Sequence, residues 1–173
     1  TCALPIYKHY GVYGLALNEH NQLLVIHKIR GPYQNRYDLP GGTLNKDESF
    51  KDCLRREFIE ETGYSIRLKE CCGIYDFLLN TPYNGCEFTQ HLAIFYLVEI
   101  QELTAEIETL VTDSRNILEL NDSAFAKWID IKQITHLNSS PLLHRAKIVL
   151  TTQQTEYEIE RYFNWEIIES PDD

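Results

Sequence analysis

The sequence contains no methionine and only two tryptophans among its 173 residues. The missing methionine indicates that the natural start is absent or was removed, which leaves a targeting segment upstream open. Basic residues are also scarce, with 16 Lys and Arg against 26 Asp and Glu and a formal net charge of -10. A groove for DNA or RNA needs clustered basic residues, so a nucleic acid polymer is not an expected partner.

Long apolar runs and paired cysteines are lacking as well. No run approaches the roughly 20 apolar residues of a membrane span, and nothing at the start is typical of a signal peptide. The five cysteines are odd in number and lack the spacing of a metal motif, and Cys71 and Cys72 are adjacent. We therefore expect reduced thiols in a cytoplasmic protein that does not bind membranes.

The composition is that of one ordinary globular domain, which we expect to span residues 1–173. The chain is 43% hydrophobic and 24% charged, and it is long enough to bury a sizeable core. Runs rich in β-branched and aromatic residues predict strands at residues 7–17, 23–29, 66–79, 88–100 and 125–131. The first two are expected to pair as a hairpin, and the nearly continuous apolar run within 88–100 to lie centrally in the sheet.

Two helices are predicted, of which the first lies within the stretch from Gly42 to Tyr64. Ser49 is placed to cap its start, with Asp52 three residues on, and Gly63 is placed for a left-handed cap at its end. The second helix is expected to begin at Ser140-Pro141. At about 100° per residue, the inward stripe of the first helix should comprise Phe50, Cys53, Leu54 and Phe58.

Three carboxylates of the first helix, Glu57, Glu60 and Glu61, are predicted to project along that inward arc. Carboxylates turned away from water lose hydration and repel one another unless something compensates. A divalent cation would do so, and an all-oxygen set at i, i+3 and i+4 suits Mg²⁺ or Mn²⁺. The alternative is a solvated acidic face, which would require the carboxylates to lie opposite the apolar stripe.

This stretch resembles the Nudix box, G-x5-E-x7-R-E-U-x-E-E-x-G-U. Every fixed position matches in spacing and identity, with one soft departure at Tyr64, where an aliphatic residue is commoner. The chain therefore resembles the MutT-like Nudix hydrolases from about residue 7 to residue 150, with residues 151–173 as a C-terminal extension. The matching residues are Gly42, Glu48, Arg56, Glu57, Phe58, Glu60, Glu61, Gly63 and Tyr64.

The resemblance implies an α/β fold with a mixed β-sheet between α-helices. It also implies hydrolysis of nucleoside diphosphates linked to another moiety, with Mg²⁺ or Mn²⁺ as cofactor. Arg56 would orient the carboxylates by ion pairing, and Glu48 would anchor the turn into the helix. The implied metal ligands are the carbonyl oxygen of Gly42 and the carboxylates of Glu57, Glu60 and Glu61.

The general base has two candidates. In the family the first glutamate of the R-E-U-x-E-E segment often serves, which here is Glu57. Some members instead use a carboxylate in the loop before the last strand, where Asp122 and Glu119 lie. Asp122 is also explained as a turn residue beside Asn121, and we favour Glu57.

Three cations flank the loop that follows the second predicted strand, namely Lys28, Arg30 and Arg36. They are either solvated loop residues or contacts to substrate phosphate, since the loop delivers the chain to the metal-bearing turn. An anionic substrate is compatible with the negative net charge because a bound metal inverts the local field.

The substrate is expected to be a nucleotide or a nucleoside diphosphate derivative, including nucleoside triphosphates. Pro82 and Tyr83 lie near the positions that mark substrate subgroups of the family without satisfying either pattern. Two alternatives are a nucleotide-metabolite sensor without catalysis and an isoprenoid diphosphate isomerase. The complete glutamate set argues against both. The segment 151–169 is expected to be an added element packed on the domain or a contact of a homodimer.

Overall fold

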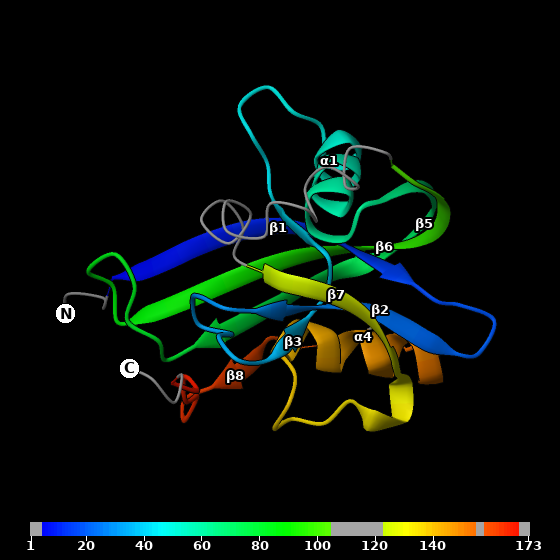
Figure 1. The fold of residues 1–173 in the computed structure, drawn as a ribbon. Coiled ribbons are helices and arrows are strands. Elements are labelled where there is room, and N and C mark those ends of the chain that lie inside the picture. Colours follow the sequence, from blue (N-terminus) through cyan, green and yellow to red (C-terminus); the bar gives the residue numbers. More distant parts are fainter. Residues whose placement is uncertain (1–4, 105–122, 155–157, 170–173) are drawn as a thin grey trace.

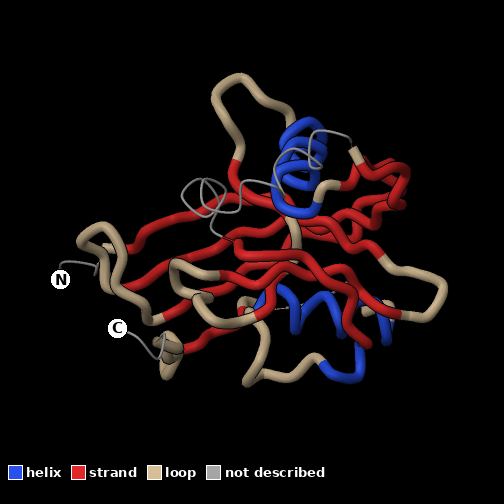
Figure 2. Tube along the Cα trace, in the orientation of Figure 1, coloured by secondary structure: helices blue, strands red, loops and turns tan. Residues whose placement is uncertain are grey.

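The fold is an α/β arrangement in which strands lie between two helices. The computed structural model describes residues 5–104, 123–154 and 158–169. Helix α1 (Phe50–Thr62) lies on one side of the strands and helix α4 (Pro141–Thr152) on the other (Figure 1). Figure 2 shows the same layering, with the helices in blue on either side of the red strands. None of the described helices is long and apolar enough to cross a membrane.

The larger sheet has five strands and is mixed. Its order is β4 (Gly41–Thr43), β1 (Ile6–Ala16), β6 (Phe88–Leu103), β5 (Tyr64–Leu79) and β8 (Glu160–Tyr162). Strand β1 runs parallel to β6, whereas β5 runs antiparallel to it. The central place of β6 confirms the prediction made from its apolar run, because a strand paired on both edges needs apolar side chains on both faces.

The smaller sheet has three strands, in the order β3 (Tyr37–Asp38), β2 (Gln22–Lys28) and β7 (Ser123–Asp130). The predicted hairpin of the first two strands is wrong. Strands β1 and β2 meet at one bridge, Leu17–Leu23, and then enter different sheets. The hydrogen-bonding edges of β1 are occupied by β4 and β6, so β2 pairs with β3 and β7 instead.

Helix α1 begins and ends as predicted. The Ser49 side chain accepts a hydrogen bond from the Asp52 amide, and Gly63 adopts the left-handed conformation at φ 82°. Cys53, Leu54 and Phe58 are buried, but Phe50 is 43% exposed, so its predicted place in the core is wrong. Phe50 lies on the correct face but is the first residue of the helix, and this end position leaves it exposed.

The C-terminal part is packed on the domain. Helix α4 begins with Ser140 as its cap and Pro141 in its first turn, as predicted. A 3-10 turn (Ile131–Gln133) leads toward it from β7. Strand β8 then pairs in parallel with the end of β5, from Phe77↔Glu160 to Leu79↔Tyr162. Residues 158–169 thus pack on the domain, as one of the two expectations for this segment had it, and a homodimer contact stays a prediction.

Candidate functional site

A polar cavity of about 510 Å³ lies where the start of the box, the helix α1 and the loop after β2 meet. It draws side chains from both sheets and from α1, so residues far apart in sequence share one space. Its lining includes Tyr7, His9, Tyr13, Lys28, Arg30, Gly31, Pro32, Tyr33, Asp38, Gly41, Gly42, Thr43, Glu57, Glu60, Glu61, Tyr83, Thr89 and His91.

The glycine turn and the helix carboxylates are in direct contact at this cavity. The amide of Gly41 donates a hydrogen bond of 2.9 Å to Oε2 of Glu61. A Cβ atom on Gly42 would lie 2.7 Å from the carboxyl carbon of Glu57, closer than atoms can approach. Glycine at position 42 therefore leaves the space in which the Glu57 carboxylate lies.

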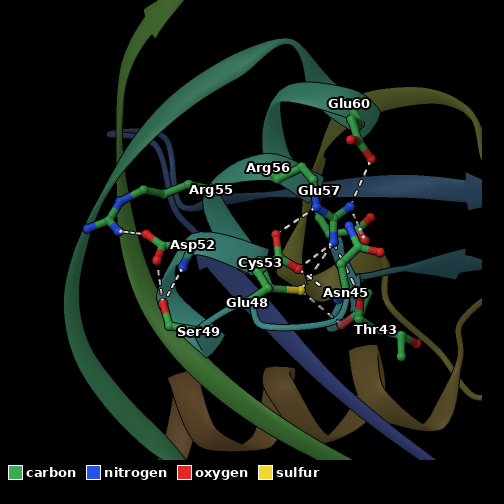
Figure 3. Close-up of polar contacts among 11 residues, drawn as sticks. Thr43, Asn45, Glu48, Ser49, Asp52, Cys53, Arg55, Arg56, Glu57 and Glu60 are labelled. Carbon is green, nitrogen blue, oxygen red and sulfur yellow. Dashed lines mark hydrogen bonds and ion pairs between the residues drawn. The ribbon is translucent and has the colours of Figure 1, made fainter.

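Arg56 joins the carboxylates into one network, drawn in Figure 3. Its Nε donates to Oε1 of Glu48 at 2.8 Å, and its Nη2 donates to Oε2 of the same residue at 3.0 Å. Its Nη1 donates to Oε1 of Glu57 at 2.8 Å and to Oε2 of Glu60 at 3.1 Å. The carboxylates of Glu57 and Glu60 are thus within reach of a single nitrogen atom. Glu48 also accepts from the Asn45 amide at 2.8 Å, which ties the loop to the helix start.

The carboxylates differ in their exposure and in their pKa values. The side chain of Glu57 is 16% exposed and that of Glu60 is 45% exposed. Burial raises the pKa of Glu57, although the neighbouring Arg56 opposes the rise. Burial raises the pKa of Glu61 to about 8, opposed by Lys28. The inward placement predicted for the three carboxylates thus holds for Glu57 and Glu61, whereas Glu60 lies at the exposed edge of the arc.

The donor chemistry of this site fits a hard divalent cation. The groups around the glycine turn are carboxylate oxygens, which Mg²⁺ and Mn²⁺ prefer, and two of them have pKa values raised by burial. In the part of the chain that the structure describes, no three Asp, Glu, His or Cys side chains already form a metal-holding group. Arg56 holds Glu57 and Glu60, and the carbonyl oxygen of Gly42 accepts from Sγ of Cys53 at 3.7 Å. The predicted ligand set stays a prediction.

The three predicted cations have different positions. Lys28 and Arg30 line the cavity. Arg36 does not, because its side chain is only 7% exposed and its guanidinium lies 4.1 Å from the ring centre of Trp165. The prediction that Arg36 contacts substrate has no support in the structure. Asp122 and the neighbouring Glu119 lie outside the described residues.

Asp38 is a cavity residue that the sequence analysis missed. It is 3% exposed, and its Oδ1 accepts hydrogen bonds from the Leu39 amide at 2.8 Å and from the Ser140 hydroxyl at 2.5 Å. Burial raises its pKa, and Lys28 opposes this rise. The available signal was an acidic residue inside the apolar strand that leads to the glycine turn.

A hydrogen-bonded group of two tyrosines and a histidine forms the buried wall of the cavity. The hydroxyl of Tyr13 lies 2.8 Å from Nε2 of His91, and that of Tyr33 lies 3.0 Å from Nδ1. Burial lowers the pKa of His91 and raises the pKa values of both tyrosines, so all three are neutral at physiological pH. His91 is buried and also lines the cavity.

These features define an α/β domain in which an acidic helix and a glycine turn form one wall of a polar cavity. The model of the NUDIX domain matches residues 7–152, and the chain belongs to the Nudix family. This confirms the resemblance and the α/β fold expected from it.

Known relatives agree with this assignment. The chain is 37% identical over 65 residues to a putative 8-oxo-dGTP diphosphatase of Bacillus subtilis, covering 38% of this chain and 42% of that protein. It is 36% identical over 112 residues to a probable DHNTP pyrophosphohydrolase of Lactococcus lactis, covering 61% of this chain and 64% of that protein. The matches thus span less than two thirds of these relatives.

Solved structures share the fold at low sequence identity. A Nudix hydrolase from Nitrosomonas europaea superposes with a TM-score of 0.61 at 20% identity, covering 80% of this chain and 84% of that one. A MutT protein from Methanosarcina mazei superposes with a TM-score of 0.57 at 21% identity, covering 84% of this chain and 93% of that one.

Proposed function

We propose that this protein is a metal-dependent pyrophosphohydrolase that cleaves nucleoside diphosphates linked to another moiety, including nucleoside triphosphates. The observation that carries the proposal is the contact between the glycine turn and the carboxylates of Glu57 and Glu61 in a cavity that Lys28 and Arg30 also line. Acidic and basic side chains in one cavity suit a phosphate substrate held through a cation.

The metal would be Mg²⁺ or Mn²⁺, held by Glu57, Glu60, Glu61 and the carbonyl oxygen of Gly42. When bound, such a cation cancels repulsion between phosphate oxygens and an attacking water, and it lowers the pKa of that water. Arg56 keeps the carboxylates of Glu57 and Glu60 side by side and ties them to Glu48. Lys28 and Arg30 would bind the substrate phosphates.

Proton removal from the attacking water is assigned to Glu57, with Asp122 as the other candidate. The assignment to Glu57 is supported by its mostly buried side chain and by the raised pKa that burial produces. A carboxylate whose pKa moves toward neutrality accepts a proton more readily than a fully hydrated one. The water would attack phosphorus, and one P–O bond of the anhydride would break.

The substrate class is supported by two observations. The curated relatives are named for 8-oxo-dGTP and DHNTP, and a third, 30% identical over 59 residues, is an ADP-ribose pyrophosphatase of Methanocaldococcus jannaschii. The cavity also extends from the carboxylates to a neutral wall of Tyr13, Tyr33 and His91, which can face an uncharged part of a nucleotide.

The decisive experiment is a panel of nucleoside triphosphates, 8-oxo-dGTP, ADP-ribose and other nucleoside diphosphate derivatives, with Mg²⁺ or Mn²⁺. Released phosphate or pyrophosphate is measured, directly and after phosphatase treatment. We expect turnover of at least one compound, loss of turnover with a chelator, and its return on adding metal. Glu57→Gln should lose most of its activity. Glu102 is an exposed glutamate near the end of β6, and Glu102→Gln serves as the matched control.

Full turnover in chelator would refute the metal mechanism. Tight nucleotide binding without turnover across the panel would instead favour the sensor hypothesis. Equal loss of activity in Glu57→Gln and Glu102→Gln would refute the assignment of the site to the box helix.

A further inference from the structure

The cavity loop between β2 and β3 (residues 29–36) is held by a segment from the other end of the chain. This loop contributes Arg30, Gly31, Pro32 and Tyr33 to the cavity lining. The segment Glu160–Ile168 lies against it, although 133 residues separate Pro32 from Trp165. The family model ends at residue 152, so this segment lies beyond the matched region.

Trp165 makes three different contacts with the loop. Its indole Nε1 donates a hydrogen bond of 2.7 Å to the carbonyl oxygen of Pro32. Its ring meets that of Tyr33 edge-on, with 6.0 Å between the ring centres. The guanidinium of Arg36 lies over the same ring at 4.1 Å. A single side chain thus contacts both ends of the short turn that faces the cavity.

A second contact fixes the same loop from the backbone of the segment. Nδ2 of Asn35 donates a hydrogen bond of 2.7 Å to the carbonyl oxygen of Ile168. Asn35 has a φ of 59°, a conformation that asparagine tolerates better than most residues. Trp165 and Ile168 therefore hold the loop at two points.

The segment is itself anchored to the domain. Strand β8 pairs with β5, and Glu160 forms an ion pair with Arg145 of α4. The hydroxyl of Tyr162 donates to Glu160 at 2.5 Å, and its ring meets Trp165 edge-on at 5.6 Å between centres. The position of Trp165 is thus fixed by the sheet and by α4 rather than by the loop alone.

From the loop, the contact continues into the cavity wall. Tyr33 is 4% exposed, and its hydroxyl lies 3.0 Å from Nδ1 of His91, which in turn bonds to Tyr13. The loop residues and the Tyr162 ring that Trp165 contacts are not members of the carboxylate network of α1. A change at Trp165 should therefore alter substrate binding more than metal binding.

We propose that Trp165 is a positioning residue, through which the C-terminal segment Glu160–Ile168 sets the wall of the cavity that binds the nucleotide. The inference rests on the proposed function, because it takes the cavity to be the nucleotide site. It implies that a chain ending near residue 152 would keep the carboxylate network and lose affinity for substrate.

The test compares Trp165→Ala, Trp165→Phe and the control Phe163→Ala. Phe163 belongs to the same segment, is 53% exposed and packs against Phe88 instead of the loop. With the best substrate of the panel, Trp165→Ala should raise KM about 10-fold while kcat stays within about 3-fold, the pattern of a lost binding interaction. Trp165→Phe keeps an aromatic ring but loses the donor to Pro32, and it should fall between the wild type and Trp165→Ala.

General destabilisation would act differently, because it lowers the active fraction and hence the apparent kcat without raising KM. The Mg²⁺ concentration for half-maximal rate should also stay at its wild-type value in Trp165→Ala. A KM within 2-fold of wild type in that variant, or an equal rise in Phe163→Ala, would overturn the proposal. If Trp165→Ala does not fold, Asn35→Asp removes the donor to Ile168 and should raise KM in the same direction.

A second readout does not depend on turnover. Backbone amides of Gln34, Asn35 and Arg36 are hydrogen-bonded within or beside the loop, at 3.1, 2.8 and 3.1 Å. Hydrogen exchange followed by mass spectrometry should show faster exchange of this loop in Trp165→Ala and no change in Phe163→Ala. Unchanged exchange would refute the holding role even if the wild type hydrolyses nucleotides. Faster exchange in a protein without turnover would refute the proposed function alone.

Discussion

Substituting Gly42 with alanine should lower activity roughly 10²-fold while leaving the fold in place. The new Cβ would lie 2.7 Å from both the carboxyl carbon and Oε1 of Glu57, and 2.9 Å from Oε2. These atoms are the far end of a flexible side chain, so they can move aside. Gly42 itself is not among the residues with positive φ, and alanine fits its backbone conformation.

The size of the effect follows from these distances. Ordinary contact begins near 3.4 Å, so the Glu57 carboxylate must move by about 0.7 Å or more. A displacement of about 1 Å at a catalytic group costs roughly 10²-fold in rate, or about 2.7 kcal/mol of transition-state stabilisation. Stability should change by less than about 1 kcal/mol, because alanine reduces the entropy of the unfolded chain and offsets part of the strain.

The assay is kcat/KM on the best substrate, measured beside the melting temperature. Gly41→Ala is the matched comparison, because Gly41 has a φ of 144° and a Cβ there would lie 2.2 Å from the carbonyl oxygen of Val12. That backbone atom cannot move aside, so Gly41→Ala should lose stability as well as activity. The double variant Gly42→Ala/Glu57→Gln should be no worse than Glu57→Gln, since both changes act on one carboxylate.

Near-wild-type activity in Gly42→Ala would refute the reasoning, since it would show that the Glu57 carboxylate is not needed where it lies. A large drop in melting temperature would also refute it, because it would show that the substitution destabilises the folded protein.

Three further predictions concern individual carboxylates. Hydrogen bonds from Arg56 lower the pKa of Glu48 from 4.5 to about 2, so the stabilisation is present above pH 4.5 and is lost as the pH falls toward 2. Glu48→Gln should therefore melt below the wild type at pH 7, with a difference that shrinks toward pH 2 in thermal melts; a constant difference would contradict this. Glu60→Gln should change metal-free stability by less than about 0.5 kcal/mol in chemical denaturation, because the pair with Arg56 is half exposed, and a clear loss would mark a structural ion pair. If Asp122 is the base, Asp122→Asn should lower kcat by roughly 10²–10⁴-fold with little change in metal affinity. If Asp122→Asn keeps its activity while Glu57→Gln loses it, the base is assigned to Glu57 of α1.

Local signals in the sequence predicted the box helix well. Its caps at Ser49 and Gly63 depend on neighbouring residues only, and both are observed. The burial of Glu57 and the exposure of Glu60 were harder to predict from the sequence. Both lie within one arc of the helix, and only the position of the sheet beneath decides which of them keeps contact with water.

Contacts between distant parts of the chain were beyond sequence patterns. The division of the strands into two sheets depends on which strand occupies each edge of β1, and periodicity carries no such information. Asp38 and His91 line the cavity because the two sheets meet there. Arg36 is not among the lining residues, and its guanidinium lies over the ring of Trp165. The carboxylate network was predictable, but the neutral wall formed by Tyr13, Tyr33 and His91 required the fold.

The parallel pairing of β1 with β6 also bears on how the chain reaches this fold. Eleven residue pairs join the two strands, from Ile6↔Phe88 to Ala16↔Val98, and each pair is 82 positions apart in sequence (88 minus 6). On the ribosome, β1 must therefore wait for β6 until residue 98 has emerged, and until then one edge of β1 lacks its paired strand. Such non-local pairing slows folding. A nascent chain halted just after the box helix would hold a complete Nudix signature and still lack the strand beside which β1 must fold.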